Sequence, residues 1–222
     1  MLAIGLLGYY LASFFDFWGL QFISAGLERL VLFIYPTLVL VISAIFFKKK
    51  IERIQYIALI ITYLGIVLAF VPEIKIGMQK NLLLGAFLIF LSALTYALYL
   101  IGNGEMVKKI GTTLFTCYAM LISTAMVIIH YFLTSTTNLF HYEPIVYQQS
   151  MIMAIFCTVI PSFLVSEGIQ RIGSGNVAII GSFGPMATIF MASYFLNETF
   201  NGWQIAGTVF ILVGVLMISV RK

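Results

Sequence analysis

The 222-residue sequence has very few charged residues, because only 9% of the chain is Asp, Glu, Lys or Arg. A soluble globular domain carries about 25%. Hydrophobic residues make up 62% of the chain, and the mean hydropathy is +1.08. Such a chain cannot cover its whole surface with polar side chains, so a soluble globular protein is excluded. We expect most of the surface to face lipid.

Residues and motifs that support catalysis or metal binding are also scarce. The only two cysteines, Cys117 and Cys157, lie inside apolar runs without a His or a second Cys at ligand spacing, which argues against a disulfide framework or a zinc site. His130 and His141 have no partners at such spacing either. The sequence contains no HExxH motif and no Gly-rich phosphate loop after a strand. We therefore expect no enzymatic activity, no metal and no cofactor.

Long apolar runs occupy most of the chain. A bilayer core of about 30 Å requires roughly 20 residues of helix. Eight runs approach or exceed that length, and they are continuous rather than alternating, which favours helices over a barrel. The predicted fold is an all-α polytopic membrane protein with eight transmembrane helices: Leu2–Phe22, Ala25–Phe47, Ile51–Val71, Asn81–Gly102, Gly111–Leu133, Tyr147–Ile172, Gly175–Leu196 and Gly202–Val220.

The Lys and Arg residues between these runs predict the orientation. Three of the twelve, Arg29, Lys75 and Lys80, fall on the side opposite the N-terminus. The other nine fall on the side of the N-terminus: Lys48, Lys49, Lys50, Arg53, Lys108, Lys109, Arg171, Arg221 and Lys222. Since basic loops stay in the cytoplasm, we expect both termini to be cytoplasmic, in a bacterial inner membrane. The net charge of +4 is thereby explained without a nucleic-acid partner.

The sequence contains an internal repeat. Gly19–Phe70 superposes on Gly168–Ser219 without a gap after a shift of 149 positions. Eight of the 52 positions are identical, and the Gly, Pro and Gln matches are the most informative: Gly19/Gly168, Gln21/Gln170, Ile23/Ile172, Gly26/Gly175, Pro36/Pro185, Phe46/Phe195, Gln55/Gln204 and Gly65/Gly214. The repeat unit spans five predicted helices, and an odd number inverts the second copy in the membrane. Inverted repeats are typical of secondary transporters.

Three stretches of this repeat resemble the EamA-like family of the drug/metabolite transporter superfamily. They are GLQFISAGLERLVLFIYPTLVLV, its later echo GIQRIGSGNVAIIGSFGPMATIFMASYFLNE, and the closing GWQIAGTVFILVGV. The resemblance implies ten helices in two inverted repeats of five around a central cavity. On that pattern residues 1–71 form a first repeat truncated to three helices, whereas residues 81–220 form a complete second repeat. We therefore expect the first two helices of the family to be absent.

This resemblance implies a secondary transporter that exports or imports a small organic metabolite by alternating access. The alternative is a non-transporting remnant, or an interaction subunit that needs a partner. The expected partners are the lipid bilayer and the metabolite, and a homodimer is left open.

Three charged residues are the first candidates for the substrate site. Asp16 lies in the first apolar run, and Glu28 and Arg29 lie near the start of the second. A charge inside a membrane is costly and marks a functional site by default. The alternative is structural: Asp16 would lie at the outer interface, Glu28 would favour a helix N-terminus, and Arg29 would reach the lipid headgroups.

Uncharged polar residues complete the predicted substrate site. Tyr35 and Tyr99 could present hydroxyl groups to a substrate, although aromatic belts at the membrane interface also contain tyrosine. Asn176 could contribute a polar contact from the second repeat.

Two further features of the helices are predicted. Pro36 and Pro185 occupy equivalent places in the two repeats and are predicted to kink their helices, either for packing or to shape the cavity. Glu167 and Arg171 have the i,i+4 spacing of a local salt bridge.

Overall fold

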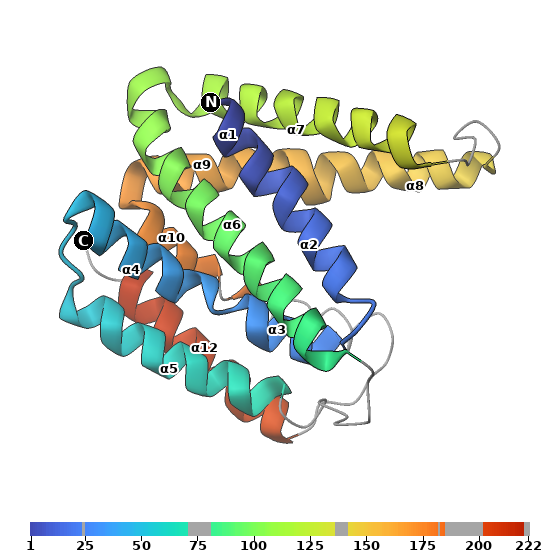
Figure 1. The fold of residues 1–222 in the computed structure, drawn as a ribbon. Coiled ribbons are helices and arrows are strands. Elements are labelled where there is room, and N and C mark those ends of the chain that lie inside the picture. The colour runs from blue at the N-terminus through green and yellow to red at the C-terminus, as the bar shows by residue number, and fades with distance from the viewer. Residues whose placement is uncertain (24, 71–80, 136–141, 182, 185–201, 220–222) are drawn as a thin grey trace.

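The structure is a computed structural model that describes residues 1–23, 25–70, 81–135, 142–181, 183–184 and 202–219. All regular secondary structure in these ranges is helical, and Figure 1 shows the helices packed as one bundle. In chain order the elements are α1 Leu2–Gly5, η1 Leu6–Leu11, α2 Ala12–Gly19, α3 Ala25–Leu32, α4 Tyr35–Phe47, α5 Arg53–Phe70, α6 Leu82–Ile110, α7 Thr112–Thr134, α8 Pro144–Met153, η4 Ala154–Val159, α9 Ile160–Ile172, α10 Ser174–Gly181 and α12 Gly202–Ser219.

Within the described ranges, four helical stretches are long and apolar enough to cross a membrane. They are Leu2–Gly19, Leu82–Ile110, Thr112–Thr134 and Pro144–Ile172. Shorter apolar helices accompany them over Tyr35–Phe47, Arg53–Leu68 and Ile205–Met217. The protruding α8 carries exposed apolar side chains, among them Met151 at 67% exposure, as expected of a surface that faces lipid.

The predicted helix Ala25–Phe47 is wrong as a single element, because the chain forms α3 and α4 with a break at Phe33 and Ile34. The cause is Pro36, which stands in the first turn of α4 and has no amide hydrogen to donate to the carbonyl of Leu32. The chain instead makes a tighter turn in which the Ile34 amide donates to the Val31 carbonyl at 3.1 Å. The expected kink is thus a full interruption of the helix.

Other predicted bounds also need correction. The predicted helix Asn81–Gly102 continues to Ile110, where Gly111 with φ +82° ends it. The predicted Tyr147–Ile172 begins earlier, at Pro144, and contains the π-helical segment η4 just before Pro161. Proline again removes a backbone donor, and a π-helical turn accommodates the loss. The first run likewise ends at Gly19 and contains the π-helical segment η1.

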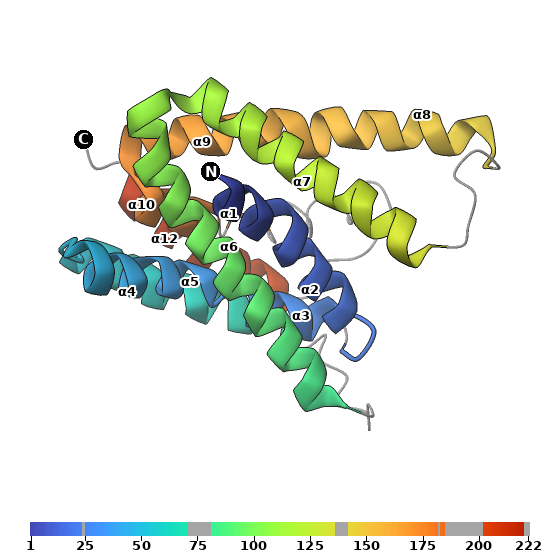
Figure 2. The ribbon, with the colours of Figure 1, turned by 45° about the horizontal axis from the view of Figure 1, so that its top comes forward.

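Helix α6 runs through the middle of the bundle. Figures 1 and 2 show α2 on one side of it and α4 on the other, and α3 and α9 also pack against it. Small residues allow this close packing. A Cβ added at Gly19 would lie 2.6 Å from the Ile89 side chain, so a larger residue would push α2 away from α6.

The most extensive contact between two elements joins α5 and α12, which are far apart in the sequence. Glycines bring their backbones together. A Cβ added at Gly65 would lie 2.7 Å from the carbonyl oxygen of Gly207, and one added at Gly214 would lie 2.9 Å from the carbonyl oxygen of Ala58. Small residues of this kind drive helix association in lipid, where the hydrophobic effect between helices is weak.

Candidate functional site

Asp16 on α2 and Glu28 on α3 form a carboxyl pair. A side-chain hydrogen bond joins them, and Glu28 is 7% exposed. The Oδ1 atom of Asp16 is buried without a hydrogen-bond partner among the described residues. An ionised carboxylate can only accept hydrogen bonds, so a bond between two carboxyl groups requires a proton on one of them. The structure therefore brings two of the predicted site residues together as a carboxyl pair.

Among the described residues, little other charge surrounds this carboxyl pair. Arg29, the neighbour of Glu28 on α3, interacts electrostatically with it. Helix α6 packs against both α2 and α3, and its residues 82–104 include no Asp, Glu, Lys, Arg or His. Residues 54–68 of α5, which also contacts α3, carry tyrosines but no charge. The α7 side presents His130, whose Nδ1 lies 2.6 Å from the Tyr10 hydroxyl.

A central cavity of about 270 Å³ lies among α4, α6, α9 and α10. Tyr35 and Tyr96 line it with their rings 5.2 Å apart, and Val177 and Gly181 line it from α10. The Tyr35 hydroxyl donates to the Ala178 carbonyl at 3.0 Å, so it ties α4 to α10 across the cavity. Tyr35, a predicted site residue, is thus placed at a mostly apolar space between elements of the two sequence repeats.

Tyr99 belongs to a buried polar network beside this central cavity. Its hydroxyl lies 2.8 Å from that of Tyr9 and accepts a hydrogen bond from Asn103 at 3.4 Å. Asn103 also donates to Ser166 at 3.0 Å, and Thr116 donates to Ser166 at 2.8 Å. The network joins the first span to α6, α7 and α9. Tyr99 itself is only 1% exposed, so in this structure it connects helices rather than facing open space.

Sequence reasoning missed the other members of this network. Asn103 was placed just beyond the predicted end of its helix at Gly102, and it therefore did not count as a polar residue inside a span. Its 0% exposure shows that it is one. Ser166 and Thr116 are small hydroxyl residues in apolar runs and carry no distinctive sequence signal.

Asn176 lies at the other end of the bundle from the carboxyl pair. Its Oδ1 accepts a hydrogen bond from Gln55 at 2.7 Å, which joins α10 to α5. Asn176 lines a separate cavity together with lysines of the α4–α5 connection. The predicted site residues are therefore distributed over separate places, and their roles in substrate binding stay a prediction. Pro185 lies outside the described residues.

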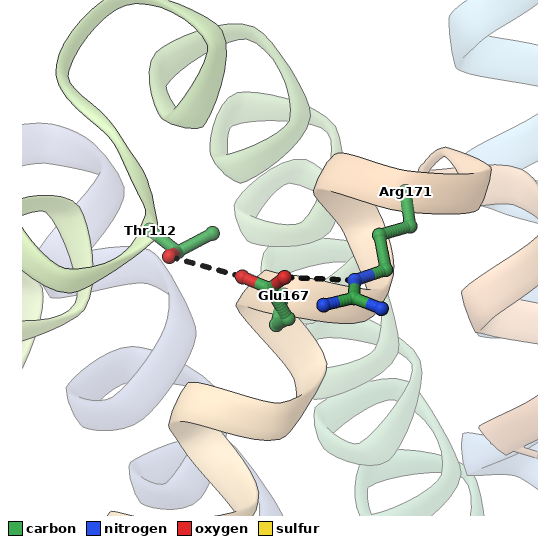
Figure 3. Close-up of polar contacts among 3 residues, drawn as sticks. All are labelled: Thr112, Glu167 and Arg171. Atoms are coloured by element: carbon green, nitrogen blue, oxygen red, sulfur yellow. Dashed lines mark hydrogen bonds and ion pairs between the residues drawn. The ribbon is translucent and has the colours of Figure 1, made fainter.

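The predicted salt bridge between Glu167 and Arg171 is confirmed. Arg171 Nε lies 2.8 Å from Glu167 Oε1 on the last turns of α9 (Figure 3). The second carboxylate oxygen of Glu167 accepts a hydrogen bond from Thr112 at 3.2 Å, a contact that the sequence did not predict. Glu167 thus holds the end of α9 against the start of α7.

Comparison with known proteins identifies the family to which this chain belongs. The model of the EamA-like transporter family matches residues 1–71 and 83–220. The chain belongs to the EamA-like transporter family. This confirms the resemblance found in the sequence, and it makes the chain an integral membrane protein of a transporter family.

Several relatives of this EamA-like chain are named as uncharacterized transporters. YcbK of Bacillus subtilis (strain 168) is 32% identical over 207 residues, which cover 91% of this chain and 66% of YcbK. YyaM of the same organism is 24% identical over 222 residues, covering 98% of this chain and 72% of YyaM. An uncharacterized transporter of Archaeoglobus fulgidus is 24% identical and is covered over 76% of its length. The chain thus spans about two thirds of YcbK and somewhat more of the other two.

A solved crystal structure has the same fold as this EamA-like chain. The superposition has a TM-score of 0.85 and covers 99% of this chain and 77% of the other, at 13% sequence identity. At that identity the likeness supports the fold alone.

Proposed function

We propose that this EamA-like chain is a proton-coupled secondary transporter that moves a small organic metabolite by alternating access. The carboxyl pair of Asp16 and Glu28 carries the coupling part of this proposal. With one shared proton, the pair is a hydrogen-bonded unit with a single negative charge beside Arg29. Without that proton, two like charges face each other in a region of low dielectric constant, where their repulsion is large. Protonation would then control how closely α2 and α3 approach.

We further propose that residues 1–71 and 81–220 belong to two inverted repeats. The bounds of the helices support this. A shift of 149 residues takes α3, Ala25–Leu32, onto α10, Ser174–Gly181, and takes α5, Arg53–Phe70, onto α12, Gly202–Ser219. The π-helical segments Leu6–Leu11 and Ala154–Val159 differ by 148 residues.

The contact between α5 and α12 gives independent support for two repeats related by a two-fold axis. The shift of 149 residues pairs Ala58 with Gly207, Thr62 with Ile211 and Gly65 with Gly214. Gly65 approaches Gly207 and Ile211, whereas Gly214 approaches Ala58 and Thr62. The contact of Gly65 with α12 is therefore equivalent, after the shift, to the contact of Gly214 with α5. This reciprocity is expected of a two-fold relation.

The metabolite would bind in the central cavity between the repeats, as in other transporters built from inverted repeats. Tyr35 and Tyr96 would supply its polar contacts, with Tyr99 fixing the neighbouring helices. The interruption at Pro36 lets α3 move relative to α4, so motion at the carboxyl pair could reach Tyr35 in the first turn of α4.

We also propose that the basic end of the bundle faces the cytoplasm, with both termini on that side of an inner membrane. The described cations of the α4–α5 connection lie beside those at the end of α6, because Lys49 pairs with Glu105 at 2.6 Å and shares a cavity with Lys108. Basic residues of short loops favour the cytoplasmic side. The carboxyl pair would then lie near the outer mouth.

Metabolite exchange by bacteria that produce the chain tests the proposed function. Medium and cell extracts are compared by untargeted mass spectrometry for wild type, Glu28→Gln and Asp16→Asn. Glu143→Gln, which changes an exposed carboxyl at the start of α8, is the control.

With wild type and with the control, we expect at least one small metabolite to change its distribution between cells and medium. This change should disappear when the pH gradient is dissipated. The two pair variants should abolish it. A change in the pair variants as large as that with wild type would contradict the coupling role, and no change with wild type would favour the non-transporting alternative.

A further inference from the structure

A second cavity, of about 290 Å³, lies at the basic end of the bundle, away from the carboxyl pair. It adjoins the central cavity, with which it shares the lining residue Ile172. It is formed where the α4–α5 connection, the end of α6 and the start of α10 meet. Lys49, Lys50 and Lys108 line it, against one acidic lining residue, Glu52. Lys49 is already paired with Glu105 at 2.6 Å, so the excess positive charge comes from Lys50 and Lys108. A ligand of this cavity would be negatively charged.

The start of α10 adds backbone donors to this basic-end cavity. The helix begins at Ser174, directly after Gly173, which has φ +83° and no side chain with which to cap the helix. The Val177 amide donates to the Gly173 carbonyl at 3.2 Å. The amides of Ser174, Gly175 and Asn176 have no acceptor within the helix. All three residues line the cavity, and free amides at a helix start bind anions.

Ser43 gives an independent indication of a ligand. It lies on α4, lines the same cavity and is 6% exposed. Its Oγ has no hydrogen-bond partner in the part of the chain that the structure describes. A buried hydroxyl without a partner is costly, and a ligand oxygen in the cavity would satisfy it.

We propose that this basic-end cavity binds a phosphate group. Phosphate offers several oxygen acceptors to donors that surround it from different elements: the Ser43 hydroxyl, the first amides of α10, and the ammonium groups of Lys50 and Lys108. Lysine and helix starts are common partners of phosphate. The cavity has room for a phosphate with a small organic part. Its source is either the headgroup of an anionic phospholipid or a soluble phosphate compound, and the same donors recognise both. This site does not depend on proton coupling or on the transported metabolite.

Two binding measurements on the purified full chain test the phosphate site and its source. The first measures binding of radiolabelled inorganic phosphate by equilibrium dialysis in an uncharged detergent. The second compares the thermal midpoint in nanodiscs of phosphatidylglycerol with that in nanodiscs of phosphatidylcholine. Lys108→Gln and Lys50→Gln change the site. Lys109→Gln and Lys48→Gln remove the same charge from neighbouring positions that do not line the cavity, so they control for non-specific attraction.

The phosphate site predicts a difference between the site variants and their matched controls. Lys108→Gln should weaken binding about tenfold, the usual loss for a hydrogen bond to a charged group, while Lys109→Gln should change it by less than about twofold. Saturable binding of inorganic phosphate with this pattern identifies a soluble compound. Stabilisation by phosphatidylglycerol alone, lost in Lys108→Gln, identifies a lipid headgroup.

Ser43→Ala keeps every charge and removes only the hydroxyl, so it remains informative if a lysine variant fails to fold. It should weaken binding in whichever measurement responds. The proposal is overturned if neither probe binds, if Lys108→Gln and Lys109→Gln lose binding equally, or if Ser43→Ala binds as wild type does.

Discussion

Helices α3 and α10 have the same length and occupy equivalent positions in the two sequence repeats, but their buried side chains differ in charge. At the second and third positions after the matching glycines, α3 carries Glu28 and Arg29, whereas α10 carries Val177 and Ala178. Glu28 pairs with Asp16 on α2, while Ala178 is packed at 1% exposure and accepts a hydrogen bond from Tyr35. Helix α3 thus carries charged side chains, whereas α10 is closely packed through a small side chain. Structural equivalence of two helices therefore does not make the site symmetric.

The largest expected effect comes from placing in α10 the charged residue that α3 has at the equivalent position. Ala178→Arg would place a long cation at a fully packed position. We expect the free energy of unfolding to fall by about 3–5 kcal/mol, the usual cost of an uncompensated buried charge. The yield of monodisperse protein after detergent extraction, and its thermal midpoint, measure this. Ala178→Ser is the matched small substitution and should fold normally. If Ala178→Arg is as stable as the serine variant, α10 tolerates charge and the contrast with α3 fails.

The contact between α5 and α12 tests whether equivalent glycines of the two repeats contribute equally to stability. Gly65→Ala and Gly214→Ala each introduce a Cβ against a backbone carbonyl of the other helix. We expect each to destabilise the protein by about 1–3 kcal/mol, the range for overpacking, and by similar amounts.

The control for the two glycine variants is Gly202→Ala, because no atom of the described residues lies within 4 Å of a Cβ added there. Thermal melts of all three in the same detergent provide the comparison. A large difference between Gly65→Ala and Gly214→Ala would break the reciprocity that supports the repeats.

A smaller effect is expected where the first repeat reaches across to α10. Tyr35→Phe removes the hydroxyl that donates to the Ala178 carbonyl and should cost about 1 kcal/mol. Tyr118→Phe, at a position that is 52% exposed, is the control. A thermal melt measures both. Equal stability of the two variants would mean that this hydrogen bond does not hold α4 against α10.

The smallest effect is expected for the exposed ion pair of the second half. Glu167→Gln breaks the bond to Arg171, whose side chain is 74% exposed. Solvent-exposed pairs contribute little to stability. The thermal midpoint should match that of wild type, and raising the salt concentration should change neither protein. A clear loss of stability would contradict this expectation and show that the ion pair itself is structural, because Gln keeps an oxygen that can accept from Thr112.

The sequence predicted the membrane class, the family and most helix positions, because these depend on long apolar runs and on Gly and Pro at fixed offsets. It also identified Asp16 and Glu28 as candidates, and their contact follows from packing between α2 and α3 that no local pattern reveals. Pro36 was recognised as a point of bending. Whether a proline bends or interrupts a helix depends on the tertiary contacts of the flanking turns, so the break could not be predicted.

Residues with ordinary sequence surroundings were harder to place. Asn103 lies one residue beyond the predicted helix end at Gly102, whereas α6 continues to Ile110 and buries it. Asn176 was expected to contribute a polar contact from the second repeat, and the structure pairs it with Gln55 at the basic end. The surroundings of both residues depend on which helices pack against each other, and apolar runs contain little information about that packing.

The glycine contact between α5 and α12 has a consequence for the order in which the protein is made. Helix α5 emerges early from the ribosome, yet its closest neighbour is the last described helix of the chain. Until α12 is inserted, the face of α5 around Gly65 has only lipid to contact. Chains interrupted before Gly202 would therefore present an unpaired small-residue surface to the membrane, which quality-control proteases could recognise and α12 would normally conceal.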